Sequence, residues 1–580
     1  MNHETIVRGE VPNPAFARRN WRSLNGVWSF AFDPENLFEK RDVNAVPYSE
    51  KITVPFCYRA ELSGVAADVD CHNVWYERCF EIRPEELAGS VLLHFGAVDY
   101  TAKVWVNGVY VGRHDGGHTP FYFDIAHLLH AGGDNRITVK AEDSFSMEVP
   151  RGKQMWGAKN ELCWYTNTVG IWQSVWLEFT GKNYLTHIRI TSDIDRNQAH
   201  FEIRARDDSA ITVQAILSVG ENRLGQMEIT PADGRCDLIY TFSEHAAMAC
   251  LDLYWSPERP VLISARIRLL QDGTEVDCVD TYFGMRKIHR EGDRIFLNNQ
   301  LLYQRLVLDQ GYWPDGMMTA PSDDAIRRDI ELTKAMGFNG ARKHQKIEDP
   351  RYYYWADRLG LLVWGELPSA YEFTWRSRSR LETEMHAFIE RDFNHPCIVQ
   401  WVPINESWGV PQVADNQQQR DFLRGLYYSV KADDPTRLVS SNDGWEQIEI
   451  TDLCGIHDYA VNPDNCARRY EDIYELMRSS VNCRPVYARG VEYNGIPIML
   501  TEMGGVSLRQ SAGWGYSDKL GDSDEMVDYL RRLMAAVRGI KEIRGFCYTQ
   551  LTDVMHETNG LLTPDREPRV PLEVLRSIFG

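Results

Sequence analysis

Apolar and polar residues alternate in short runs over the first 180 residues of the chain. Lys103-Val104-Trp105-Val106 alternates as a strand with one buried face does, and the following Asn107-Gly108 is a strong signal for a tight hairpin turn. Similar runs, rich in aromatic and β-branched residues, span residues 26–32, 74–80, 90–95, 102–108 and 136–140. Because strand follows strand with no helical periodicity between them, we predict a jelly-roll β-sandwich for residues 1–180.

Shorter strand patterns continue over the next hundred or so residues. They cover residues 187–190, 199–204, 212–217 and 261–267. This length and spacing are typical of an immunoglobulin-like β-sandwich, which we predict for residues 181–285.

From residue 286 onwards the pattern changes to strands that alternate with amphipathic helices. Eight apolar strands are expected at residues 302–309, 338–344, 361–367, 398–406, 437–443, 453–459, 497–502 and 545–552. Helical periodicity follows, for example at 323–336, 350–359, 381–393, 419–431 and 525–537, with Ser322 as the N-cap of the first of these helices. Eight such units predict a (β/α)8 TIM barrel over residues 286–580, and the pattern is weakest between residues 443 and 470.

Composition and charge narrow the classes of partner. The chain is 43% hydrophobic and 25% charged, as folded globular proteins are, and its net charge of −20 disfavours nucleic acid and anionic membranes. The first residues lack the pattern of a signal peptide, and no apolar run has the length of a membrane span. The 12 cysteines show no metal-ligand spacing, so we expect reduced thiols, no metal, no cofactor and a cytoplasmic location. A homo-oligomer is compatible with the sequence.

Polar side chains gather where the predicted barrel strands end. Asn405 and Glu406 close one apolar strand, and Glu502 closes another on the opposite side of the barrel. Catalytic residues of such barrels stand at these carboxyl-terminal strand ends. Two carboxyl groups about 5 Å apart suit a glycosidase that retains anomeric configuration, one as the acid and one as the nucleophile. The acid must be protonated near neutral pH, so we expect its pKa to be raised by burial and by its ionised partner.

Other strand ends supply groups that could bind a sugar. Asn405 can bind a hydroxyl next to the reacting carbon, and Arg342 can keep the nucleophile ionised. The remaining candidates for substrate contact are His344, Trp364, His457, Tyr459, Gln550 and Asp553. Asp309, Glu366 and Asp443 fit structural caps as well as they fit site residues.

Several motifs together resemble glycoside hydrolase family 2, the family of β-galactosidases, β-glucuronidases and β-mannosidases. They are residues 24–28, 52–55, 104–108, 170–177 and 283–288 and the pairs Asn405-Glu406 and Thr501-Glu502. The resemblance covers essentially the whole chain. It implies a sugar-binding-like first domain, retention of configuration and exo action on a glycoside or oligosaccharide. It also implies that Glu406 is the acid/base, that Glu502 is the nucleophile, and that Tyr459 or His457 contacts the nucleophile.

The sugar is left open by one departure from the family. Its glucuronidases carry an Asn-x-Lys motif for the uronic carboxylate, and the matching residues here are Asn559-Gly560-Leu561. This favours a β-galactoside-type substrate, pyranose or furanose, such as a β-galactofuranoside or an α-L-arabinofuranoside. Arg342, Lys343 and Arg566 offer other routes to a carboxylate, so a β-glucuronidase remains the alternative.

Motifs of several other enzyme classes are missing from the sequence. The chain lacks the zinc-protease helix, the nucleophile elbow of serine hydrolases and the glycine-rich phosphate loops. A catalytically weak glycan-binding protein is the alternative of another class.

Overall fold

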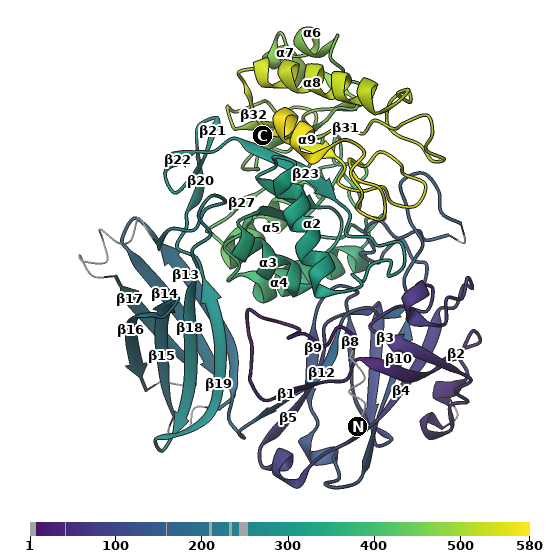
Figure 1. Cartoon of the computed structure of the whole chain (residues 1–580), viewed down its shortest axis with the longest axis vertical. Helices are drawn as coiled ribbons and strands as arrows, with labels where there is room; N and C mark the ends of the chain where they lie inside the picture. The colour runs from purple at the N-terminus through teal and green to yellow at the C-terminus, as the bar shows by residue number, and fades with distance from the viewer. Residues whose placement is uncertain (1–6, 41, 158, 208–210, 231–234, 243–252) are drawn as a thin grey trace.

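The computed structural model describes residues 7–40, 42–157, 159–207, 211–230, 235–242 and 253–580. Two β domains lie side by side, and an α/β domain sits across their ends (Figure 1). We retain residues 180 and 285 as the proposed limits between the three. Within the described ranges, none of the helices is both long and apolar enough to span a membrane.

The first domain is a sandwich of two antiparallel sheets. One sheet has the order β1 (Trp21–Ser23), β12 (Val175–Thr180), β5 (Ser90–Phe95) and β9 (Phe121–Asp124). The other has the order β3 (Glu50–Val54), β2 (Gly26–Phe32), β4 (Asn73–Glu81), β10 (Asp134–Glu142), β7 (Thr101–Val106) and β8 (Val109–Asp115). Asn107 and Gly108 turn with φ of 51° and 80° while Val106 pairs with Val109, which confirms the predicted hairpin.

The second domain is a smaller sandwich that has a core of its own. Its sheets are β13 (Leu185–Asp193), β14 (Gln198–Ala205) and β17 (Arg235–Thr241) against β16 (Asn222–Ile229), β15 (Ile211–Val219), β18 (Ile263–Gln271) and β19 (Thr274–Phe283). Alternate residues such as Ile263, Ala265 and Ile267 of β18 are fully or almost fully buried, and their neighbours point outward. This alternation is what the sequence pattern predicted for a sheet with one buried face.

The third domain is an eight-stranded parallel sheet wrapped into a barrel. Its order is β27 (Leu438–Val439), β26 (Ile398–Val402), β25 (Leu362–Glu366), β24 (Gly340–Lys343), β23 (Gln304–Asp309), β32 (Ile543–Thr549), β31 (Ile498–Gly504) and β28 (Cys454–His457). All eight predicted strands are present, so the predicted TIM barrel is confirmed. The two ends of the sheet, β27 and β28, share no ladder in the described chain, and β28 lies in the region where the sequence pattern was weakest.

Helices cover the outside of the barrel, and a small sheet precedes its first strand. The helices are α2 (Asp323–Ala335), α3 (Pro350–Leu359), α4 (Trp375–Asp392), α5 (Gln417–Asp433), α6 (Cys466–Arg469), α7 (Ile473–Met477), α8 (Ser523–Gly539) and α9 (Leu572–Phe579). The small sheet is β20 (Ile288–Glu291), β21 (Arg294–Leu297) and β22 (Gln300–Leu301). The hydroxyl of Ser322 accepts the backbone N–H of Ala325 at 3.1 Å, which confirms the predicted N-cap of α2.

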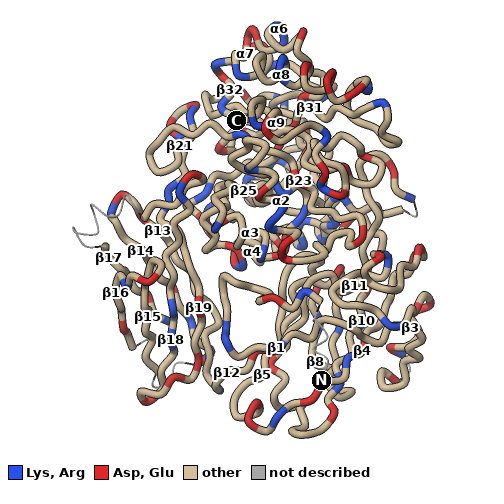
Figure 2. The backbone as a smooth tube through the Cα atoms, in the orientation of Figure 1, with Lys and Arg blue, Asp and Glu red and all other residues tan. Residues whose placement is uncertain are grey.

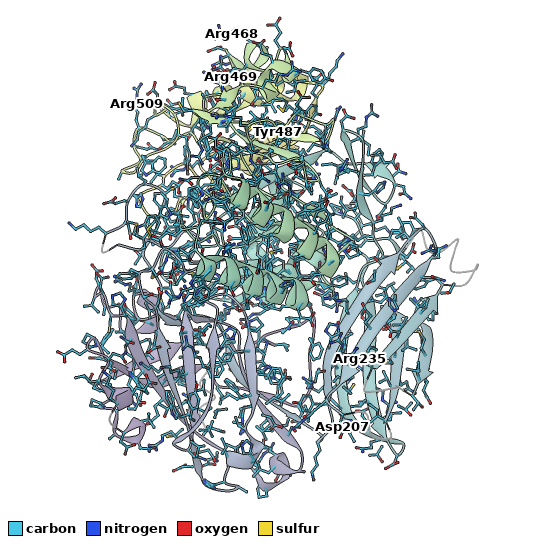
Figure 3. The ribbon with its side chains drawn as sticks, turned by 180° about the vertical axis from the view of Figure 1, so that it is seen from behind. Asp207, Arg235, Arg468, Arg469, Tyr487 and Arg509 are labelled. Atoms are coloured by element: carbon cyan, nitrogen blue, oxygen red, sulfur yellow. The ribbon has the colours of Figure 1, made fainter. Side chains whose placement is uncertain are left out.

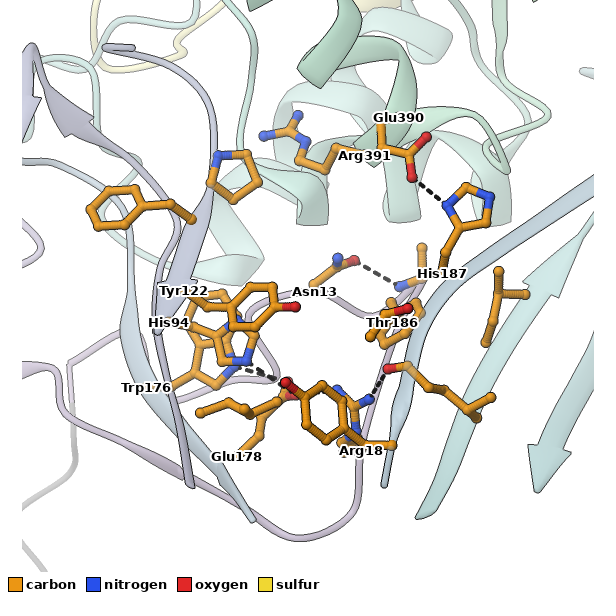
Figure 4. A pocket seen from close by; sticks show the side chains of 18 of the residues that line it. Asn13, Arg18, His94, Tyr122, Trp176, Glu178, Thr186, His187, Glu390 and Arg391 are labelled. Atoms are coloured by element: carbon orange, nitrogen blue, oxygen red, sulfur yellow. Dashed lines mark hydrogen bonds and ion pairs between the residues drawn. The ribbon is translucent and has the colours of Figure 1, made fainter. Parts of the chain in front are cut away.

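Buried charges and stacked rings join the three domains. Arg18 donates to Asp277 of β19 and to Glu178 of β12, and all three side chains are almost fully buried. Beside them is a cavity of about 300 Å³ whose walls come from all three domains (Figure 4). Trp176 and His94 stack in one wall, while the His187–Glu390 ion pair joins β13 to α4 across another. Its lining includes none of the predicted site residues, so this cavity belongs to the domain junction.

Charged residues are dispersed rather than segregated. Basic and acidic positions are interspersed over all three domains of the described chain (Figure 2). Seen from behind, Arg468, Arg469 and Arg509 lie at the far end of the barrel, and Asp207 and Arg235 mark the second domain (Figure 3). The excess of negative charge in the sequence is therefore spread over the molecule.

Candidate active site

The carboxyl ends of the barrel strands bring Glu406 and Glu502 together. Glu406 follows β26 and Glu502 lies within β31. One carboxylate oxygen of each glutamate and one ring nitrogen of His457 all lie within 4.8 Å of one another. This separation is close to the value of about 5 Å between the two carboxyl groups of retaining glycosidases.

Arg342 at the end of β24 contacts several other polar residues of the site. Its Nε donates to Glu366 at 2.6 Å, its Nη2 donates to Asn405 Oδ1 at 2.6 Å, and its Nη1 donates to Glu502 Oε1 at 3.1 Å. Nη1 also lies 2.9 Å from Asp443 Oδ2. Burial alone would lower the pKa of Arg342, but the surrounding carboxylates hold it well above its usual range. The guanidinium is therefore a permanent charge whose donors are already used by the protein.

Both oxygens of Glu502 have partners. Arg342 binds Oε1, and the hydroxyl of Tyr459 donates to Oε2 at 2.7 Å. The ring of Tyr459 is stacked on Tyr516 with centroids 3.6 Å apart, which holds the hydroxyl in place. His457 Nδ1 lies 3.4 Å from the same oxygen, so the structure places both residues that the resemblance implied next to Glu502.

The pKa of Glu406 is lowered, contrary to the expectation from the sequence. Burial raises it, but His457 Nδ1 lies 2.6 Å from Glu406 Oε1, and this contact outweighs burial. The reverse holds for His457: burial lowers its pKa, yet Glu502, Asp443 and Glu406 together raise it to about 10. The imidazolium lies between the two glutamates, so the pair Glu406–His457 holds one proton at neutral pH, and that proton is on the histidine.

The backbone around Glu406 is unusual. Glu406 and Ser407 have φ of 52° and 60°, in the left-handed region that costs residues other than glycine of the order of 1 kcal/mol each. A bond from the N–H of Glu406 to the carbonyl of Asp443 at 2.8 Å holds this turn. Next to it, the Nδ2 of Asn405 is buried and has no partner among the described residues. The amide therefore presents a free donor at the site, as a group that binds a sugar hydroxyl would.

Other predicted residues lie in different surroundings. The fully buried Trp364 donates its indole N–H to Gln304 at 2.8 Å, so this group is already bound within the protein. Asp553 is paired with Arg569 and accepts the N–H of Gly560 at 2.8 Å in the loop after β32. Substrate contact by these two residues stays a prediction: position at a strand end was its basis, and the polar groups of both side chains have partners in the protein.

His344 and Gln550 lie closer to the reacting groups. His344 Nδ1 is 3.0 Å from Glu366 and 4.0 Å from Glu502, and burial lowers its pKa well below the usual range, so it is neutral. Gln550 donates to Asn559 at 2.6 Å, and its own Oε1 is buried without a partner in the described chain. A neutral ring and a free amide oxygen are suitable for hydroxyl contacts.

Residues from the first domain also reach the site, and no sequence pattern predicts them. The segment between β10 and β11 (Gly170–Ile171) carries Lys153 and Tyr165, and the hydroxyl of Tyr165 donates to Glu557. Glu557 is fully buried and also accepts from Tyr516 at 3.2 Å. Strand-end reasoning could not find these residues, because they lie on loops whose course no periodicity fixes.

Among the residues that the structure describes, two groups of side chains have the donors of a metal site. Glu406, His457 and Glu502 form one, but hydrogen bonds from Tyr459 and Arg342 and the charge on His457 occupy its donor atoms. Asp357, His395 and Cys397 form the other, where Asp357 accepts from Tyr282 at 2.9 Å and from the N–H of Cys397 at 2.8 Å. Both groups are thus explained by internal hydrogen bonding.

Comparisons with known proteins place the chain among the glycosidases. Models for glycosyl hydrolases family 2 match the sugar-binding domain at residues 21–181, the middle domain at 183–286 and the TIM barrel domain at 295–502. A putative β-glucuronidase of Formosa agariphila is 27% identical over 76% of this chain and 52% of its own length. A β-galactosidase of Thermoanaerobacter pseudethanolicus is 26% identical over 66% of this chain and 50% of its own length. The chain thus spans about half the length of these two relatives.

Other relatives match from end to end. A β-glucuronidase of Paenibacillus borealis is 23% identical over 97% of both chains. The solved β-galacturonidase of Eisenbergiella tayi bound to galacturonate shares the fold with a TM-score of 0.76, at 21% identity over 97% of this chain and 98% of that one. A β-glucuronidase of Ruminococcus gnavus in complex with D-glucuronic acid shares it with a TM-score of 0.78, at 18% identity over the same shares. The chain belongs to glycosyl hydrolase family 2.

Proposed function

We propose that this protein is a retaining exo-glycosidase that works by double displacement. The observation that carries the proposal is the pair Glu406 and Glu502, whose oxygens lie within 4.8 Å of each other. In the first step the Glu502 carboxylate attacks the anomeric carbon while the bond to the leaving oxygen breaks and that oxygen takes a proton from Glu406. In the second step Glu406 removes a proton from water, which attacks the same carbon and releases Glu502.

His457 supplies the proton that Glu406 alone lacks at neutral pH. A carboxyl with a lowered pKa is a poor proton donor at neutral pH, but the pair with His457 holds a proton there. When a glycosidic oxygen approaches Glu406, the proton can pass from His457 to Glu406 and then to the leaving group. Asp443, 3.2 Å from the other ring nitrogen, keeps the imidazole oriented.

For the sugar, we propose a β-linked uronic acid, and this reverses the order of the two alternatives from the sequence. Relatives named β-glucuronidase span this chain from end to end, and solved β-galacturonidase and β-glucuronidase structures share its whole fold. A β-galactoside is the second candidate. It is favoured by Leu561, which is fully buried among the apolar residues of the barrel and offers no charge to a carboxylate, and by the relative named β-galactosidase.

A panel of p-nitrophenyl glycosides tests both levels of the proposal. We expect hydrolysis of the β-glucuronide or β-galacturonide above that of the neutral β-galactoside and the furanosides. Glu502→Gln should lose turnover by at least ~10³-fold, and Glu475→Gln on the exposed face of α7 serves as the matched control. Unchanged turnover in Glu502→Gln contradicts the mechanism. No turnover of any glycoside by the wild type favours the glycan-binding alternative.

A further inference from the structure

A segment of the first domain closes over the mouth of the barrel. The N–H groups of Arg151 and Gly152 both donate to the carbonyl of Ser369, at 3.1 and 3.2 Å, in the loop after β25. Gly152 has φ of 59°, and a side chain there would collide with the carbonyl oxygen of Gln345. The backbone of Lys153 is then fixed from the other side, because its carbonyl accepts the N–H of Tyr165 at 2.7 Å. Lys153 is therefore held at one place relative to the barrel.

Lys153 is almost fully buried as a residue, and its ammonium lacks an anionic partner. The residue is 4% exposed, and Nζ lies 5.5 Å from the centroid of the Tyr165 ring and 5.7 Å from that of Trp408. Across the described chain, no carboxylate oxygen comes within 4.0 Å of it.

Nearby buried cations are committed to protein anions. Arg342 is bound by Glu366, Glu502 and Asp443, as described above. Lys343 lies 2.9 Å from Asp309 and 2.8 Å from Glu348. Arg566 is held 3.1 Å from Asp329 with its guanidinium over the ring of Trp313. The three alternative routes to a carboxylate that the sequence left open are thus closed.

Lys153 nevertheless belongs to the electrostatics of the catalytic centre. Burial alone would lower its pKa, but Cys163, Glu557, Glu502 and Glu406 together raise it, so the group is charged. A charged ammonium that has been removed from water without a direct partner is unfavourable, and a ligand anion placed beside it relieves that cost. The ring of Trp408, two residues after Glu406, lies 5.7 Å from Nζ, so the ammonium lies beside the strand end that carries the acid/base candidate.

We propose that Lys153, contributed by the first domain, binds the carboxylate of the uronic acid substrate and so determines the specificity of the barrel. The inference rests on the proposed uronide hydrolysis. The carboxylate of a pyranosiduronic acid is attached to C5, which the ring oxygen separates from the anomeric carbon C1, so a cation near the catalytic pair can bind it while the two glutamates act at C1. The aromatic walls next to the ammonium exclude water, which strengthens a charge-assisted hydrogen bond there.

The test compares each acid substrate with its own methyl ester, which keeps the ring and removes the charge. The p-nitrophenyl β-glucuronide and β-galacturonide and their methyl esters are assayed with the wild type, Lys153→Met and Lys159→Met. Lys159 is exposed on the same segment and serves as the matched control. We expect the wild type to prefer the acid over its ester in kcat/KM by on the order of 100-fold, Lys159→Met to keep that ratio, and Lys153→Met to lose it.

Each outcome separates this inference from the proposed function. If Lys153→Met keeps the wild-type ratio of kcat/KM for acid and ester, or loses activity on both alike, Lys153 does not bind the carboxylate. The proposed uronide hydrolysis is unaffected by that result. If the wild type cleaves neither uronide, the proposed sugar class fails and the inference fails with it. Should Lys153→Met not fold, as judged by circular dichroism, the same ratio measured in Lys153→Gln decides.

Discussion

Replacing His457 with glutamine removes the charge that lies between the two catalytic glutamates. Folding raises the pKa of His457 from 6.5 to about 10, and the side chain is fully buried. At about 1.36 kcal/mol per pKa unit, this corresponds to at most about 5 kcal/mol of stabilisation of the protonated ring. Because the pKa is raised on folding, that stabilisation is complete below pH 6.5 and is lost as the pH rises from there to about 10.

The same change alters which group holds the catalytic proton. In the wild type the pair Glu406–His457 holds it, so activity on a substrate that needs acid assistance should persist to alkaline pH. Without the imidazolium, the neighbour that lowers the pKa of Glu406 is gone, and burial raises that pKa. Glu406 alone nevertheless loses its proton at a lower pH than the Glu406–His457 pair does. We therefore expect the alkaline limb of kcat/KM in His457→Gln to move to lower pH by about one unit or more, and kcat at pH 7 to fall by about 10- to 100-fold.

The assay is the dependence of kcat/KM on pH between 4 and 10 with a poor leaving group and, separately, with a dinitrophenyl glycoside. The dinitrophenyl substrate departs without a proton, so its alkaline limb should move much less. His386→Gln, a histidine on the exposed face of α4, is the control and should match the wild type. An alkaline limb that stays in place in His457→Gln would refute the shared proton.

Three further changes test other parts of the structure. Glu406→Ala should slow hydrolysis of poor leaving groups by about 10²- to 10⁴-fold, and added azide should restore turnover and give a glycosyl azide of retained configuration; absence of rescue contradicts its role as acid/base. Arg18→Ala removes the buried arginine that pairs with Asp277 and Glu178, and it should destabilise the domain junction by about 3–5 kcal/mol in urea unfolding. The exposed neighbour serves as the control, since Arg19→Ala should change stability by less than about 0.5 kcal/mol. Gly152→Ala should raise KM for the uronide and leave the Glu502 chemistry intact, since the added methyl displaces the segment that carries Lys153; an unchanged KM argues against that segment.

Much of the fold could be predicted because its signals are local. The strands of the barrel are apolar runs bounded by polar residues, and the predicted helix at residues 350–359 matches α3 to the residue. Helix α4 begins at Trp375, six residues before its predicted start, because its capping residue Thr374 precedes a polar first turn that carries no apolar periodicity. Strand β27 is reduced to Leu438–Val439, and its pairing with the segment after β26 resumes only as an isolated bridge between Asn405 and Asp443.

The site was predictable only in part. Two glutamates and an asparagine at strand ends follow from the barrel itself, whereas Lys153 and Glu557 depend on how loops from two domains meet. The direction of the pKa of Glu406 could not be foreseen, because burial raises it and His457, on a different strand, is the main neighbour that lowers it. For Trp364 and Asp553 the sequence identified the strand-end positions but not the partners in the protein that bind their polar groups.

Trapping the covalent intermediate is the most direct test of Glu502 as the nucleophile. The wild-type protein is incubated with a 2-deoxy-2-fluoro uronosyl fluoride, digested and analysed by mass spectrometry. We expect a single added uronosyl group on the peptide that contains Glu502, and none in Glu502→Gln. A label on another residue, or turnover that inverts the anomeric configuration by NMR without any label, would contradict it.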